Sequence, residues 1–168
     1  EPEPEPEPEP PALIAVIPHG ETERTAMVGN PEGGALFEDS CEGNQVLTGF
    51  AGGLRLGGGW ISTLSLLCAD IQVPIGEPQV STGAPQELGV RGVDNGVEPF
   101  RIVCPEGSAV VAINGNAGQL IDRIGMQCAP INAPPNGAGQ LTWIDSQPGQ
   151  SAGSLGGEEF PRLSCPRE

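Results

Sequence analysis

Residues 120–128 read Leu-Ile-Asp-Arg-Ile-Gly-Met-Gln-Cys, and residues 60–68 read Trp-Ile-Ser-Thr-Leu-Ser-Leu-Leu-Cys. In both stretches the residues at even positions are mostly apolar, and those at odd positions are mostly small or polar. This period of two places the two sets on opposite faces of a strand, one buried and one wetter. A helix would instead need apolar residues three and four apart. The stretches therefore predict strands in an all-β protein.

The similarity between the two stretches continues upstream. Phe37 stands four residues before Cys41, as Phe100 stands four residues before Cys104. The segments at the ends of the two stretches also agree. Residues 68–74 read Cys-Ala-Asp-Ile-Gln-Val-Pro, and residues 128–134 read Cys-Ala-Pro-Ile-Asn-Ala-Pro. The chain therefore contains an internal repeat of about 60 residues.

Two complete units and one divided unit account for most of the chain. The complete units span about residues 33–74 and 97–134. The front of a third unit is expected at 156–168 and its back at 12–18, so that the two terminal segments share one sheet. The middle of this third unit is missing. Residues 12–168 are therefore expected to form one domain.

The first 11 residues consist of Glu-Pro dipeptides with one further proline. Proline fixes φ and lacks an N–H donor, and the like charges repel, so an extended polyproline-type tail is expected. The chain has a net charge of −15 and no lysine, which makes nucleic acid an improbable partner. No apolar run is long enough to span a bilayer.

The chain has five cysteines, at equivalent places in the repeat. Cys41 with Cys68 and Cys104 with Cys128 each bracket a unit on strands expected to be neighbours, which predicts two disulfides and a secreted or cell-surface protein. A zinc site is the competing interpretation, but the chain has no Cys-x-x-Cys pair and a single histidine. Cys165 has no partner in this scheme and is expected to be a free thiol or a link to another chain.

The second unit also carries a motif. It reads Cys104-Pro105-x-Gly107, then Val110-Val111-Ala112-Ile113-x-Gly115, then Ile121-Asp122-x-Ile124-Gly125-Met126-x-Cys128. This pattern resembles a unit of the jacalin-like β-prism group and is similar to that of the vitelline membrane outer layer proteins. The resemblance implies three four-stranded Greek-key sheets arranged as a prism, and it suggests carbohydrate binding. The sugar site of jacalin-like lectins uses a Gly-rich loop ending in an Asp. The Gly-rich stretch before Trp60 lacks that Asp, and Asp145 is not in a matching setting.

The sequence gives little reason to expect an enzyme. His19 lies in an expected turn without a nearby nucleophile, and Asp122 and Asp145 are the only carboxylates considered as a glycosidase pair. Asp122 is matched by Ser62 in the other unit, which favours a role in capping a turn. No cofactor is expected. Asp94-Asn95-Gly96 with Glu98 could surround a calcium ion, although an Asn-Gly turn explains this segment better.

The incomplete third unit leads to the first functional hypothesis. A sheet without its central strands leaves open edges, which another chain can fill. We expect a non-enzymatic structural subunit that forms a homopolymeric filament or surface layer, with an N-terminal strand donated between chains. The alternatives are a secreted lectin-like module that binds a glycan, and a fragment of a longer repeat array. The expected donor strand consists of Ala12, Leu13, Ile14, Ala15, Val16 and Ile17.

Overall fold

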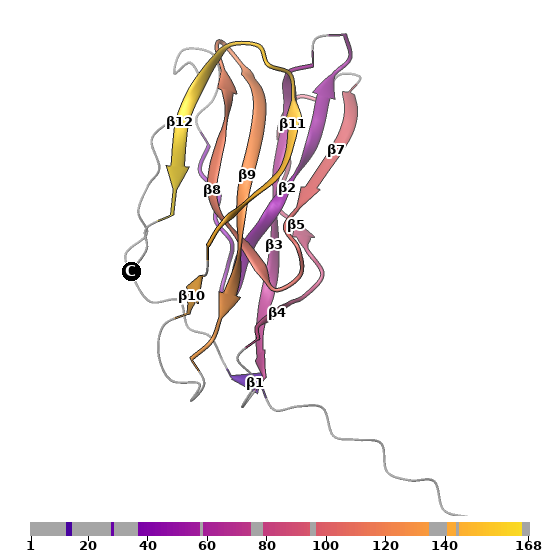
Figure 1. Cartoon of the computed structure of the whole chain (residues 1–168). Coiled ribbons are helices and arrows are strands. Elements are labelled where there is room, and N and C mark those ends of the chain that lie inside the picture. The colour runs from indigo at the N-terminus through magenta and orange to yellow at the C-terminus, as the bar shows by residue number, and fades with distance from the viewer. Residues whose placement is uncertain are drawn as a thin grey trace, which may run out of the picture.

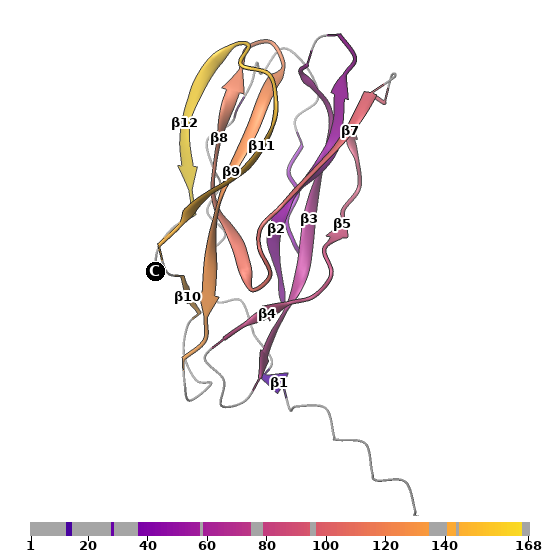
Figure 2. The ribbon, with the colours of Figure 1, turned by 45° about the vertical axis from the view of Figure 1, so that its right-hand side comes forward.

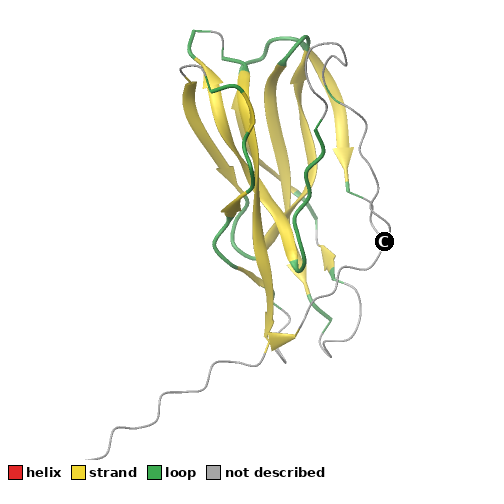
Figure 3. Ribbon diagram, turned by 180° about the vertical axis from the view of Figure 1, so that it is seen from behind, coloured by secondary structure: helices red, strands yellow, loops and turns green. Residues whose placement is uncertain are grey.

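The computed structural model describes residues 13–14, 28, 37–57, 59–74, 79–94, 97–134, 141–143 and 145–165. These residues form strands and loops without a helix (Figure 3). The expectation of an all-β fold is therefore confirmed. The strands form two antiparallel sheets that lie side by side (Figures 1 and 2).

The first sheet is built on the hairpin of β2 (Gln45–Arg55) and β3 (Ile61–Pro74). The short strands β5 (Gln86–Glu87) and β6 (Arg91–Gly92) pair with the outer side of β3. The chain then returns to pair β7 (Val97–Val103) with the outer side of β2. Three strands in succession and a fourth that returns beside the first make a Greek key. Two more short strands, β1 (Leu13–Ile14) and β4 (Ser81–Thr82), pair with the far end of β3.

The second sheet repeats this topology. The hairpin of β8 (Ser108–Ala117) and β9 (Ile121–Asn132) is flanked by β11 (Gln147–Gly153) on β9 and by β12 (Glu158–Ser164) on β8. The short strand β10 (Thr142–Trp143) pairs with the end of β9.

The two hairpins also share their irregularities. The register of β2 against β3 shifts between Leu47 and Gly49, and that of β8 against β9 shifts between Val110 and Ala112. The register shifts a second time near the tip of each hairpin. This second shift lies between Gly53 and Leu54 in the first hairpin and between Asn116 and Ala117 in the second. The repeat in sequence is therefore a repeat in backbone geometry, and equivalent residues can be counted from these shifts.

The boundaries of the repeat differ from those expected. The sequence repeat places Phe100 in the second unit, but Phe100 lies in β7 and pairs with Gly52 of the first sheet. Phe160 in β12 pairs with Gly115 of the second sheet in the same way. The front of each sequence copy is thus the closing strand of the preceding Greek key. A repeat in sequence gives the period of the structure but not its phase.

This difference removes the expected third sheet from the described residues. The C-terminal segment does not open a new unit, because β12 completes the second sheet. The N-terminal segment does not join it, since Leu13 pairs with Pro74 and Ile14 with Val73. The prediction that the two terminal segments share one sheet was wrong for these residues. The rest of the expected donor strand, Ala12 and residues 15–17, lies outside the described residues, as does the Glu-Pro tail.

Two apolar clusters join the sheets. The larger cluster combines Phe50 and Ile102 of the first sheet with Ile124 and Met126 of the second, all at most 5% exposed. The smaller cluster joins the far ends of the long strands β3 and β9, where Val73 meets Ile131. Burial of these side chains from both sheets is the main force that holds the Greek keys together.

The alternation of β3 does not give one buried and one wet face. Thr63 and Ser65, expected on the wetter face, are only 5% and 2% exposed. The reason is that the sheet curls, so that its edges approach each other. Arg101 on β7 reaches across the concave side of the hairpin and donates a hydrogen bond to the Pro85 carbonyl beside β5, at 3.2 Å. Small side chains fill the concave side beneath it.

A polar concave face as the candidate binding site

The concave face of the first sheet is lined by small residues. Gly53 pairs with Thr63, and Ala51 pairs with Ser65. All four are buried. This face has no room for a ligand and few groups that could bind one.

The concave face of the second sheet carries longer polar side chains at the equivalent positions. Asn116 pairs with Arg123 in place of Gly53 and Thr63. Asn114 pairs with Gly125 where the first sheet has an alanine and a serine. A Cβ atom at Gly125 would lie 2.9 Å from Asn114 Oδ1, so this glycine makes room for the amide. Asn114, Asn116 and Arg123 are half-buried, so their polar groups line a face that solvent still reaches.

Several of these side chains are held by hydrogen bonds. Arg123 Nη2 donates to Ser151 Oγ at 2.9 Å. Ser146 Oγ donates to Gln127 Oε1 at 3.1 Å and accepts from Arg162 Nη2 at 3.4 Å. These bonds connect strands from both edges of the sheet and fix the side chains in place. We call this set the polar face: Asn114, Asn116, Arg123, Gln127, Ser146, Ser151 and Arg162.

The side-chain amides of Asn114 and Asn116 have no hydrogen-bond partner among the residues that the structure describes. Each amide offers two N–H donors and one carbonyl acceptor. Because both residues lie on the rigid central strand β8, these groups stand in fixed positions. Groups of this kind can both donate hydrogen bonds to ligand hydroxyl groups and accept hydrogen bonds from them.

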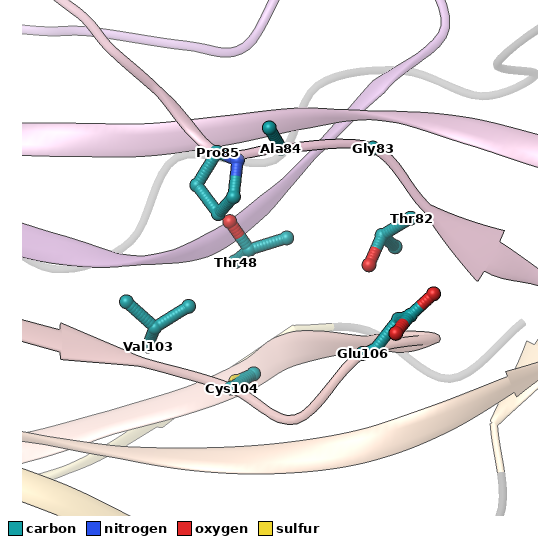
Figure 4. A pocket seen from close by; sticks show the side chains of 8 residues that line it. All are labelled: Thr48, Thr82, Gly83, Ala84, Pro85, Val103, Cys104 and Glu106. Atoms are coloured by element: carbon teal, nitrogen blue, oxygen red, sulfur yellow. The ribbon is translucent and has the colours of Figure 1, made fainter.

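A surface cleft of about 380 Å³ lies at the end of the first sheet (Figure 4). Its hydroxyl groups are already engaged. Thr48 Oγ1 donates to the Leu67 carbonyl at 3.0 Å, and Thr82 Oγ1 accepts from the Gly107 N–H at 3.1 Å. The remaining polar side chain in the wall is Glu106. The cleft is thus less suited to a polar ligand than the polar face.

The four cysteines expected in disulfides form two bonds with the expected partners. Cys41 is bonded to Cys68 and Cys104 to Cys128, each with a Cα–Cα distance of 5.6 Å. The second bond joins the residue that follows β7 to strand β9, and therefore connects the two sheets.

Cys165 is a free cysteine. Its N–H donates to the Val111 carbonyl at 2.8 Å, just as the Cys104 N–H donates to the Thr48 carbonyl at 2.7 Å. Cys165 is therefore the structural counterpart of Cys104. Its thiol lies 3.8 Å from the Val110 carbonyl oxygen and is partly buried, and this burial raises the pKa of the thiol.

The two aspartates considered as a glycosidase pair lie far apart. Asp122 is at the start of β9, where its carboxylate contacts the loop at Gly156. Asp145 precedes Gln147, which pairs with Cys128 at the other end of the strand. At about 3.3 Å per residue the two are separated by roughly 20 Å or more, which is too far for the two carboxylates of a glycosidase.

His19 and the Asn95-Gly96 segment that could surround a calcium ion lie outside the described residues. Among the residues that the structure does describe, no group of three potential ligands could hold a metal ion. Trp60 is half-buried beside the tip of the first hairpin.

The sequence hypotheses missed the polar face as a site. The alternation in residues 120–128 places Arg123 and Gln127 on the wetter side of their strand, but this pattern does not reach Asn114 and Asn116. Comparison of the two copies could have found them, because Ala51 and Gly53 occupy these positions in the first. That comparison requires the hairpin register, which the sequence repeat alone does not supply.

No helix in the described part of the chain is long and apolar enough to cross a membrane. Comparisons of the chain with protein-family models, with curated proteins and with solved structures find no match.

Proposed function

We propose that this chain is a non-catalytic, extracellular carbohydrate-binding module, and that the polar face holds the sugar. The observation that supports this proposal best is the pair of amides at Asn114 and Asn116. They lie half-buried on a rigid strand, without partners among the described residues. Sugar hydroxyls both donate and accept hydrogen bonds, so each amide can satisfy them in both directions.

Two further features agree with this proposal. The two disulfides suit an oxidising, extracellular setting. Each sheet is a Greek key with four principal strands, the kind of sheet that jacalin-like β-prism proteins contain. We propose that the chain is related to that group, with two of the three prism sheets represented by β2–β7 and β8–β12. This resemblance is a weaker argument than the polar face, because unrelated functions share a fold.

The proposal is tested by glycan binding. Wild-type protein applied to an array of oligo- and polysaccharides should bind a subset of them. The double substitution Asn114→Ala with Asn116→Ala should weaken this binding about tenfold or more, because two hydrogen bonds to the ligand are lost.

Asn44→Ala is the matched control, since Asn44 is exposed just before β2 and lies outside the polar face. It should bind as the wild type does. Folded wild-type protein that binds no glycan on a broad array would refute the proposal. Equal binding by the double variant would show that the sugar lies elsewhere.

Assembly through a donated N-terminal strand is a second candidate. Its support is that the described part of β1 pairs along the edge of β3, at Pro74 and Val73. The edge of a sheet can accept a strand from a neighbouring chain in the same way. Such contacts between copies would extend into a filament or surface layer.

A further inference from the structure

Two arginines of the polar face have no acidic partner among the residues that the structure describes. Arg123 and Arg162 donate their described hydrogen bonds to the hydroxyl groups of Ser151 and Ser146. No described carboxylate lies within 4.0 Å of either guanidinium group. A guanidinium group binds a hydroxyl less strongly than it binds a carboxylate, so both arginines retain much of their capacity for an anion.

Arginines of the first sheet differ in this respect. Arg91 forms an ion pair with Asp39 at 2.6 Å. Arg101, the structural counterpart of Arg162, lies 3.9 Å from Glu87. Arg101 and Arg162 each reach across the concave side of their sheet, from the closing strand to the opposite edge. In the first sheet this edge supplies the Glu87 carboxylate, and in the second it supplies the Ser146 hydroxyl.

The charges around the polar face are mixed but leave the arginines accessible. Glu159 pairs with Asn116 at the outer edge of the sheet and is exposed. Asp122, next to Arg123 in sequence, contacts the glycine loop at Gly156. Asp145 is exposed beside Ser146. None of these carboxylates pairs with Arg123 or Arg162 in the described structure.

We infer that the polar face selects glycans that carry acid groups, with Arg123 and Arg162 binding carboxylate or sulfate and the amides binding neighbouring hydroxyls. This inference rests on the proposed carbohydrate binding and names its ligand class. The planar guanidinium group can form two parallel hydrogen bonds with either anion. The chain as a whole carries a charge of −15, so general attraction would not bring an anion to it. Binding therefore requires these two local cations.

Three probes separate the ligand classes: polygalacturonate with carboxylates, dextran sulfate with sulfates, and neutral dextran. Binding is measured by calorimetry with the full chain at an ionic strength of about 0.15 M, where long-range repulsion is screened. At least one acidic probe should bind at least tenfold more tightly than neutral dextran. Arg123→Gln and Arg162→Gln should each reduce this binding about tenfold, because each removes a charged hydrogen-bond donor.

Arg101→Gln is the matched control, since it removes the same charge from the equivalent position of the first sheet. It should bind the acidic probe as the wild type does. Thermal unfolding of all three variants checks that they are folded. Arg123→Gln is decisive if Arg162→Gln destabilises the sheet.

If neutral glycans bind as well as acidic ones and Arg123→Gln has no effect, the inference fails while carbohydrate binding stands. If no glycan binds, the proposed function itself fails. If polyglutamate binds as tightly as the acidic glycans, charge alone explains the binding and the inference is wrong.

Discussion

Asp39 and Arg91 show how single residues fasten the segment before the first hairpin. Arg91 donates from Nη2 to Asp39 Oδ1 at 2.6 Å and from Nε to Oδ2 at 3.0 Å. The two bonds connect a loop to the edge strand β6. The hydrogen bonds from Arg91 hold the pKa of the Asp39 carboxyl below its ordinary value of 3.8.

Asp39→Asn should lower the melting temperature at neutral pH. The pKa of Asp39 is lower in the folded than in the unfolded protein, so its contribution to stability is present above the unfolded value and is lost as pH falls through the folded one. The difference between variant and wild type should therefore shrink below pH 3.8. Circular dichroism melts across this range measure it.

Glu87→Gln is the comparison for this experiment, because Glu87 makes only the 3.9 Å contact with Arg101. It should change the melting temperature less than Asp39→Asn does. A melting-temperature difference for Asp39→Asn that persists unchanged at about pH 2 would contradict the assigned role.

Prediction of single residues from the sequence worked best for the cysteines. Their equal places in the repeat indicated the pairs that the structure contains, although Cys41 and Cys104 lie beside strands and not on them as expected. The polar face was harder to predict. Asn114 and Asn116 become notable only when they are compared with Ala51 and Gly53, and that comparison depends on the bulge that precedes them.

Among the strands, the closing strands β7 and β12 are fitted to their sheets by an aromatic ring over a glycine. A Cβ atom at Gly52 would lie 3.0 Å from Phe100 Cε1, and one at Gly115 would lie 2.9 Å from Phe160 Cε1. Each added Cβ would also meet a carbonyl oxygen of the adjacent strand. Glycine is thus required at both positions so that the ring and the neighbouring backbone can approach.

Gly52→Ala and Gly115→Ala should each destabilise the protein by about 1–3 kcal/mol, as expected when a group is forced into a filled space. Urea denaturation followed by tryptophan fluorescence gives the free energy of unfolding. Gly89→Ala is the control, because a Cβ atom there meets nothing within 4 Å. If Gly115→Ala unfolded at the same urea concentration as Gly89→Ala, the fit of Phe160 would not matter.

The strands themselves were largely predictable, but their grouping was not. The alternation at 60–68 and 120–128 marks β3 and β9 correctly. The stretch around Phe100 was grouped with the hairpin that follows it, because the sequence repeat has no marked starting point. Hydrogen bonding between strands decides where each structural unit begins, because β7 pairs with β2 and not with β8. The curl of the sheets, which buries Thr63 and Ser65, is also invisible in a period of two.

The whole molecule is expected to be a monomer in solution. Both closing strands lie at sheet edges and carry a proline, Pro99 in β7 and Pro161 in β12. Proline and charged residues at an edge oppose the addition of further strands. Sedimentation should therefore give a single species near 17.2 kDa.

A ladder of larger species under non-boiling conditions would contradict this expectation and support assembly. Leu13→Asp with Ile14→Asp would then show whether the N-terminal strand is responsible. Loss of the ladder in this variant would establish strand donation. An unchanged ladder would point to a different contact between chains.

The bond between Cys104 and Cys128 has a mechanical consequence. It joins the residue that follows the closing strand of the first Greek key to strand β9 of the second, and it encloses all of β8 in a covalent loop. A pulling force along the chain therefore cannot peel β8 away residue by residue. While the bond is intact, the force passes through the two sulfur atoms and β8 carries none of it. A reductant that breaks the bond would place β8 and the start of β9 under load.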